Sequence, residues 1–218
     1  MPRSDSYAGY RAKLVEAVRQ TGIRDLAVLR AVGEVPRHLF VPPALRRQAY
    51  EDTALPIGSG QTISQPSTQA RALEALRLTG REKVLEVGTG LGYQTALLAM
   101  VAGQVFSMER VAALAERARA ALAEAGIGNV SVMVGDGTLG WRAYAPFEAM
   151  VVAAATREVP RPLLEQLAPG GRILLPLGPR ESQVLTLITV NADGTTNAQP
   201  LAGARFVPLR GTHGFTDA

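Results

Sequence analysis

The chain has 218 residues, of which 47% are hydrophobic and 19% charged, and its formal net charge is +4 at pH 7. This length and composition are typical of one globular domain with a substantial buried core. The chain contains no cysteine, which excludes disulfides, thiolate metal sites and cysteine nucleophiles. No apolar run is long enough to span a membrane, and residues 1–6 lack a signal-peptide pattern. We therefore expect a cytoplasmic protein without a membrane partner.

The basic residues are scattered along the chain. An isoelectric point near 9.8 raises the question of nucleic-acid binding. However, Lys13 and Lys83 are the only lysines, and Arg46-Arg47 is the only adjacent basic pair. A solvated surface explains this pattern best, so we expect no nucleic-acid partner and a mild attraction for anionic substrates.

The chain before about residue 78 is expected to form a helical extension. Ser6–Val32 has the apolar spacing of two amphipathic helices, with Asp25 as the N-cap of the second. Three prolines punctuate Val35–Pro43 and predict a structured loop. Another helix is expected from Pro66 to Leu76, since proline is favoured in a first helical turn.

From Leu78 onward, strands alternate with helices, a pattern that predicts a doubly wound, mostly parallel α/β sheet with helices on both faces. The expected strands are Lys83–Val87, Val105–Met108, Val130–Val134, Ala149–Ala153, Ile173–Leu177 and Val184–Val190, and the expected helices are Gln94–Val101, Val111–Ala125 and Pro160–Leu167. We expect a single domain, with residues 1–77 as the helical and substrate-covering segment, 78–210 as a nucleotide-binding core and 211–218 as a poorly ordered tail.

The segment Val84–Gly92 reads Val-Leu-Glu-Val-Gly-Thr-Gly-Leu-Gly, an apolar strand that runs into a glycine turn and then a helix. Gly88, Gly90 and Gly92 allow the main chain to turn sharply and to approach a ligand closely. The N–H groups at the start of the helix, near Tyr93, then point at that ligand. Turns of this kind bind dinucleotides or S-adenosylmethionine, and the neighbouring residues must decide between them.

Three acids follow or occupy successive strands. Glu109 ends the second strand, where it can accept hydrogen bonds from ribose hydroxyls or cap the helix that begins near Arg110. Glu86 lies inside the first strand, where a buried acid needs a partner, so it suits a cationic amino-acid group or is a structural acid. Gly135-Asp136-Gly137 follows the third strand and either reads an adenine edge or forms an ordinary turn. Together these acids favour S-adenosylmethionine.

A block upstream of the glycine turn carries a family resemblance. It reads Val35-Pro-Arg-His-Leu-Phe-Val-Pro42 and then Leu55-Pro-Ile-Gly-Ser-Gly-Gln-Thr-Ile-Ser-Gln-Pro66, and the likeness continues to Arg205-Phe-Val-Pro-Leu209. These strings closely resemble the protein-L-isoaspartate O-methyltransferases. The resemblance implies a Rossmann-like class I methyltransferase that uses S-adenosylmethionine, without a metal, to methylate the free α-carboxylate of isoaspartyl residues in damaged proteins. The methyl ester then cyclises and gives the residue repeated chances to reopen as aspartate.

By this resemblance Ser64 corresponds to the active-site serine, whose hydroxyl can hydrogen-bond the substrate carboxylate; its alternative role is to cap the helix from Pro66. An ionised carboxylate needs no strong general base, in keeping with a chain that has only two histidines, His38 and His213. For His38 we favour a structural role, and for Arg37 we leave open whether it pairs with the substrate carboxylate. The expected donor-binding residues are Thr62, Ile63, Glu86, Gly88, Thr89, Gly90, Gly92, Glu109, Arg110, Gly135, Asp136 and Gly137, and the expected substrate contacts are Gln65, Pro66, Arg205 and Phe206.

Two departures from the family pattern are present. Ser67-Thr68 stands where many members have an aromatic residue or a histidine, so the peptide preference is open, and Thr89 replaces a common serine. Three alternatives remain: a methyltransferase acting on an ordinary aspartate of a dedicated peptide precursor, a protein that binds S-adenosylmethionine without turnover, and an NAD-dependent oxidoreductase. We expect a monomer whose partners are isoaspartyl proteins and peptides.

Overall fold

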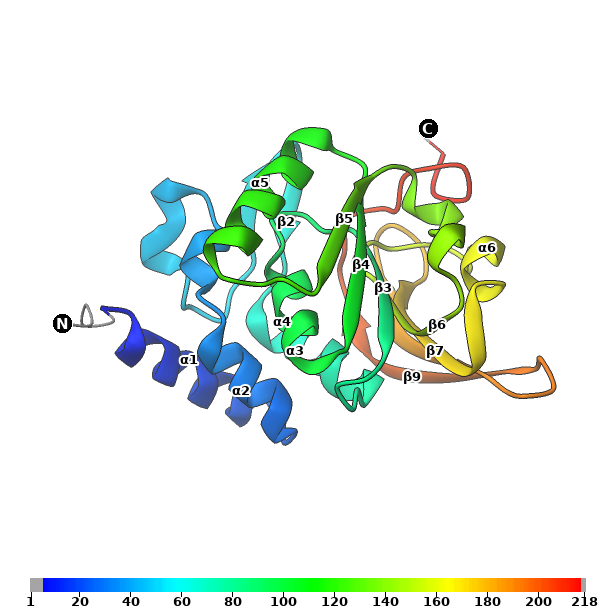
Figure 1. Cartoon of the computed structure of the whole chain (residues 1–218), viewed down its shortest axis with the longest axis horizontal. Coiled ribbons are helices and arrows are strands. Elements are labelled where there is room, and N and C mark those ends of the chain that lie inside the picture. The colour runs from blue at the N-terminus through cyan, green and yellow to red at the C-terminus, as the bar shows by residue number, and fades with distance from the viewer. Residues whose placement is uncertain (1–5, 217–218) are drawn as a thin grey trace.

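The computed structural model describes residues 6–216, and its centre is a sheet of order β5-β4-β3-β6-β7-β8-β9 (Figure 1). The strands are β3 (Lys83–Val87), β4 (Gln104–Glu109), β5 (Val130–Val134), β6 (Phe147–Val152), β7 (Leu167–Leu177), β8 (Gln183–Val190) and β9 (Thr196–Ala204). Strands β3 to β7 pair in parallel, whereas β8 pairs antiparallel with both β7 and β9. The predicted doubly wound, mostly parallel sheet is confirmed.

Helices cover both faces of the sheet. They are α1 (Ala8–Gln20), α2 (Leu26–Glu34), α3 (Pro66–Leu76), α4 (Tyr93–Val101), α5 (Ala112–Glu124) and α6 (Arg161–Leu164). Figure 1 shows α1 to α5 on one side of the sheet and the short α6 on the other. Because side chains alternate along a strand, Val84 of β3 packs in the core under the first group and Leu85 in the core beside α6.

The structure adds elements that the sequence patterns do not predict. Strand β9 contains Pro200 and Gly203 and is largely exposed, features typical of an edge strand and not of a buried apolar run. Strand β7 begins at Leu167, before the predicted Ile173, and this earlier start shortens the predicted helix Pro160–Leu167 to α6.

A small hairpin leads the chain into the region of the glycine turn. Its strands β1 (Leu55–Gly58) and β2 (Gln61–Ile63) are joined by Ser59 and Gly60, both with positive φ, at 54° and 68°. Two successive residues of this kind make the turn that matches the natural twist of a hairpin. The hairpin therefore delivers Ser64 directly to the start of α3.

The predicted N-cap is confirmed, since Asp25 Oδ1 accepts hydrogen bonds from Ala27 N and Val28 N at 2.8 and 3.2 Å. The C-terminal segment differs from the expectation of a poorly ordered tail over residues 211–216, where Phe215 is buried and Thr212 is bonded to Asp136. Residues 217 and 218 lie outside the described part. Over residues 6–216, no helix is long and apolar enough to cross a membrane.

Candidate active site

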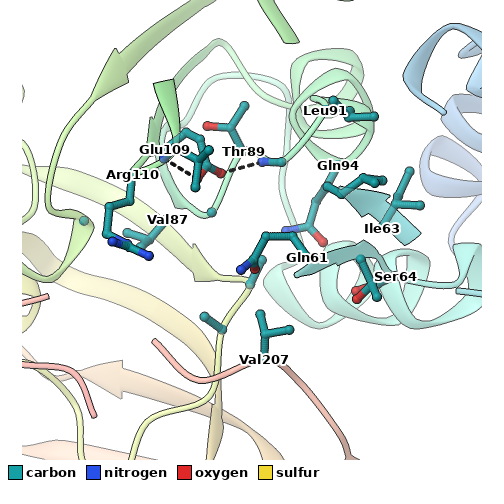
Figure 2. Close-up of a pocket in the computed structure, with 18 of the residues that line it drawn as sticks. Gln61, Ile63, Ser64, Val87, Thr89, Leu91, Gln94, Glu109, Arg110 and Val207 are labelled. Carbon is teal, nitrogen blue, oxygen red and sulfur yellow. Dashed lines mark hydrogen bonds between the residues drawn. The ribbon is translucent and has the colours of Figure 1, made fainter. Parts of the chain in front are cut away.

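A pocket, here called the main pocket, opens at the carboxyl ends of β3, β4 and β6, where the chain order of the sheet reverses. This is the position at which doubly wound sheets bind their ligands. Figure 2 shows Glu109 and Arg110 at one end of the pocket and Ser64 at the other. The lining residues are Ile57, Gln69, Tyr93, Gln94, Gly137, Ala153, Ala154 and residues 61–64, 87–91, 108–111 and 207–210.

The glycine turn between β3 and α4 forms one wall of the main pocket. Gly88 and Gly90 adopt positive φ of 100° and 58°, and a Cβ on Gly90 would come within 3.2 Å of Ile57 Cδ1. Gly90 N donates to Glu109 Oε2 at 2.8 Å, and Val111 N donates to Glu109 Oε1 at 2.9 Å (Figure 2). Glu109 thus fixes both the turn and the approach to α5. Since a carboxylate oxygen accepts more than one hydrogen bond, Glu109 can still accept from ribose hydroxyls.

Ser64 lies where the main pocket meets a second depression, here called the side groove. The two share Thr62, Ser64, Ala153 and Val207. The side groove is otherwise lined by Ala54, Gln65, Thr68, Arg71, Leu185 and residues 202–206. A group bound in the side groove can therefore meet a group bound in the main pocket beside the Ser64 side chain.

Comparisons with known proteins agree on one family. The family model of protein-L-isoaspartate (D-aspartate) O-methyltransferase matches residues 10–214. Protein-L-isoaspartate O-methyltransferase 1 of Anaeromyxobacter sp. (strain Fw109-5) is 56% identical over 205 residues, which cover 93% of this chain and 97% of that protein. The corresponding protein of Methanoculleus marisnigri is 50% identical and covers 94% of this chain and 93% of its own. The chain belongs to the protein-L-isoaspartate (D-aspartate) O-methyltransferase family.

Solved structures of this family share the fold. One protein-L-isoaspartate O-methyltransferase superposes with a TM-score of 0.84 and 29% identity, covering 94% of this chain and 67% of that chain. Another, from Plasmodium falciparum and in complex with S-adenosyl-L-homocysteine, superposes with a TM-score of 0.79 and 25% identity. The match covers 92% of this chain and 98% of that chain. The Rossmann-like methyltransferase fold expected from the sequence is therefore confirmed.

Ser64, the catalytic residue expected from the resemblance, does not cap α3. The N-cap is Gln65, with no side-chain capping bond, so the alternative role considered for Ser64 is wrong. Its main-chain oxygen instead accepts a hydrogen bond from Arg37 Nη2 at 3.2 Å. Arg37 is fully buried, which lowers its pKa and removes it from contact with a substrate carboxylate. This settles the question left open for Arg37 in favour of a structural role.

His38 also lies outside the two depressions. Its ring stacks on Tyr7 with the centroids 4.0 Å apart, and its Nδ1 lies 2.7 Å from the Tyr50 hydroxyl. The structural role favoured for this histidine fits these contacts.

Glu86 lies behind the glycine turn, and its Oε1 has no hydrogen-bond partner within the described chain, so its expected contact with the ligand stays a prediction. Glu86 is fully buried on the α4 side of β3 and is not part of the pocket lining. Ser107 Oγ and Thr95 Oγ1 donate to its Oε2 at 2.6 and 2.5 Å, and the Thr89 hydroxyl lies 2.5 Å from that of Ser107. Burial raises the pKa of Glu86 to about 7, against the opposing effect of these hydroxyl bonds. Glu86 thus supports the glycine turn from behind, through Ser107 and Thr89.

The carboxylate of Asp136 is likewise held by the protein itself. Oδ1 accepts from Thr138 N and Oγ1 at 2.9 and 2.7 Å, and Oδ2 accepts from Thr212 N and Oγ1 at 2.7 and 2.8 Å. Partial burial raises the pKa of Asp136, but these hydrogen bonds outweigh it and hold the pKa below its ordinary value. Both oxygens already accept hydrogen bonds from the protein, and the expected contact of this side chain with an adenine edge stays a prediction.

The structure brings most of the other predicted residues together. Those in the main-pocket lining are Thr62, Ile63, Gly88, Thr89, Gly90, Glu109, Arg110 and Gly137, whereas Gly92 and Gly135 lie outside it. Of the predicted substrate residues, Gln65, Arg205 and Phe206 line the side groove, and the buried Pro66 lines neither depression.

The sequence patterns did not predict that three glutamines and a segment near the C-terminus line the main pocket. Gln61, Gln69 and Gln94 line the main pocket, as do residues 207–210. Gln69 is buried, and its Oε1 has no hydrogen-bond partner within the described chain. A glutamine among the apolar positions of a helix was the available signal for Gln69 and Gln94, since a buried amide needs a partner.

Proposed function

We propose that this chain transfers the methyl group of S-adenosylmethionine to the free α-carboxylate of L-isoaspartyl residues in damaged proteins and so initiates their repair. The observation that carries the proposal is the position of Ser64 at the wall shared by the main pocket and the side groove. The main pocket suits a nucleoside with an amino-acid end, and the side groove suits a peptide.

The residues of the main pocket fit the methyl donor. The carboxylate of Glu109 suits the two ribose hydroxyls, and the glycine turn allows close approach of the main chain. The unpartnered Oε1 of Gln69 is a buried acceptor that suits the ammonium group of the donor. When bound, the donor supplies an electrophilic methyl group on a sulfonium.

The chain's contribution to the reaction is positioning. An isoaspartyl α-carboxylate is ionised at neutral pH, so its oxygen can attack the methyl carbon without losing a proton. The Ser64 hydroxyl donates a hydrogen bond to this carboxylate and orients the attacking oxygen, while apolar neighbours such as Ile57 and Ile63 limit access of water. Alignment of this kind supplies roughly 7–11 kcal/mol in favourable cases.

The test is transfer of label from S-adenosylmethionine to matched peptides that carry either isoaspartate or aspartate at one position. A base-labile ester on the isoaspartyl peptide alone supports the proposal, and Ser64→Ala should lower kcat/KM strongly. Ser182→Ala, at an exposed serine outside both depressions, is the matched control. Label on the aspartyl peptide would instead identify a precursor-modifying enzyme. Donor binding without any transfer would identify a binding protein.

We also propose that the protein acts as a monomer in the cytoplasm, without a nucleic-acid or membrane partner. The scattered arginines support the absence of a nucleic-acid partner, since the sequence forms no basic run. Light scattering of the purified protein tests the oligomeric state, and fractionation of the source cells tests the location.

A further inference from the structure

The side groove is lined by two positively charged residues, Arg71 and Arg205. Among residues 6–216, no acidic residue lines it. Arg71 lies on α3, one turn after Thr68, whereas Arg205 directly follows β9. The two arginines therefore border the groove from two separate segments of the chain.

These charges are not neutralised by the protein. Within residues 6–216, neither arginine takes part in an ion pair. Arg71 Nη2 donates only a long bond of 3.3 Å to Thr21 O, which leaves its other N–H groups available. The nearby Asp52 accepts from Ser67 N at 2.8 Å and is not part of the groove lining.

The main chain that carries Arg205 is held in place. Phe206 N donates to Gln183 Oε1 at 2.9 Å, and Gln183 Nε2 in turn donates to the carbonyls of Pro179 and Arg180. Gln183 is buried, so this anchor is shielded from water. Arg205 itself is exposed and projects from a fixed segment at the rim of the groove.

We propose that the side groove selects isoaspartyl peptides that carry a second acidic side chain next to the isoaspartate, with Arg71 and Arg205 as the specificity-determining residues. This inference rests on the proposed function. The isoaspartyl carboxylate itself goes to Ser64, so the flanking acid meets the two arginines farther along the groove. Charge pairs at a partly exposed site act mainly on binding, and salt weakens them.

The experiment compares isoaspartyl peptides that differ only in having Glu, Gln or Lys at one position, placed before or after the isoaspartate. On at least one side we expect the Glu peptide to have a KM about three- to tenfold below that of the Lys peptide, with a smaller change in kcat. The ratio should shrink at high ionic strength.

Variants test whether the two arginines cause the preference. Arg205→Glu should shift the preference toward the Lys peptide, and Arg71→Gln should reduce the ratio between the Glu and Lys peptides. Arg30→Gln removes an exposed charge on α2 that lies outside the groove and is paired with Glu34, and it should leave the ratio unchanged. Thermal unfolding of each variant checks that it is folded.

The two possible failures are distinct. Equal kcat/KM for the Glu, Gln and Lys peptides, or a preference that Arg205→Glu and Arg71→Gln do not alter, would overturn the inference alone. If calorimetry shows donor binding but no isoaspartyl peptide is methylated, the proposed function is wrong and the inference falls with it.

Discussion

Arg37 Nη2 donates to the main-chain oxygen of Ser64 at 3.2 Å, and the same guanidinium holds a loop that precedes Ser64 in the chain. Nη1 donates to Ala49 O at 2.7 Å, and Nη2 also donates to Thr53 O at 3.2 Å. Arg37 is fully buried, and its guanidinium carbon lies 5.3 Å from the centre of the Tyr93 ring. The Arg37 guanidinium thus fixes the position of Ser64 through hydrogen bonds to main-chain oxygens, from the buried side of the loop.

Arg37→Lys keeps the charge but cannot reproduce this set of bonds, because an ammonium lacks the planar fork of donors. We expect a loss of about 1–3 kcal/mol in the free energy of unfolding, since buried carbonyls lose their donor. The activity of the folded fraction should also fall, because Ser64 is no longer held. Thermal unfolding and kcat/KM measure the two effects, with the exposed Arg30→Lys as control. Unchanged values of both would contradict the role given to Arg37.

Glu86→Gln tests the buried network behind the glycine turn. The pKa of Glu86 rises from an ordinary 4.5 to about 7 in the folded protein, so the folded state holds this proton more tightly. Its contribution to stability is therefore fully present below about pH 4.5 and is lost progressively as the pH rises to about 7. The amide introduced by the substitution does not ionise, so the variant should gain stability relative to the wild type over this window, by about 3 kcal/mol.

The measurement for Glu86 is the difference in free energy of unfolding between the two proteins at several values of pH. Taking the difference removes the contributions of all other titrating groups. Glu116→Gln, at an exposed acid of α5, provides the control. A difference that stays constant from pH 4.5 to pH 8 would show that the pKa of Glu86 is not raised in the folded protein.

The central strands were predictable because they are short apolar runs separated by helical periodicity. Two of them, Lys83–Val87 and Val130–Val134, have the predicted bounds. Strand β9 was missed because its exposed Thr-Asn-Ala-Gln-Pro sequence is poor in the β-branched and aromatic residues that identify a strand. Its pairing with β8, across a short turn that contains Asp193-Gly194, places it at the edge of the sheet.

The candidate site was predictable where local sequence determines geometry, as in the glycine turn and the acid that ends β4. The position of Glu86 was harder to foresee, because it depends on which face of β3 carries it. Glu86 shares a face with Val84 and pairs in register with Ser107, so it points toward α4 and away from the pocket. The Asp136–Thr212 contact joins residues 76 positions apart, which periodicity cannot reveal.

Glu109→Gln should weaken donor binding. An amide has one acceptor oxygen and one NH₂ group, so at least one of Gly90 N and Val111 N would face a donor in place of an acceptor. The loss of charge also weakens any bonds from ribose hydroxyls. We expect the Kd for S-adenosylhomocysteine, measured by titration calorimetry, to rise about tenfold or more. Glu116→Gln is again the control, and an unchanged Kd would remove Glu109 from the donor site.

Asp136 and Thr212 provide the last prediction, because their two hydrogen bonds tie the C-terminal segment to the turn after β5. Residues 207–210, just before Thr212, form a wall of the main pocket. Thr212→Val removes the hydroxyl donor and Asp136→Asn removes the charged acceptor, and each should raise the Kd for S-adenosylhomocysteine because the wall is less firmly held. As both changes break the same contact, the double variant should lose less stability than the sum of the two single variants, with a coupling energy of about 1 kcal/mol in the free energy of unfolding.

The pH dependence of stability supplies a second check of the contact between Asp136 and Thr212. Since the folded protein holds the pKa of Asp136 below its ordinary 3.8, the stability that this group contributes is present above that value and is lost as the pH falls further. The loss of stability that Asp136→Asn causes relative to the wild type should therefore disappear at low pH. Additive effects of the two substitutions would mean that this contact does not hold the wall.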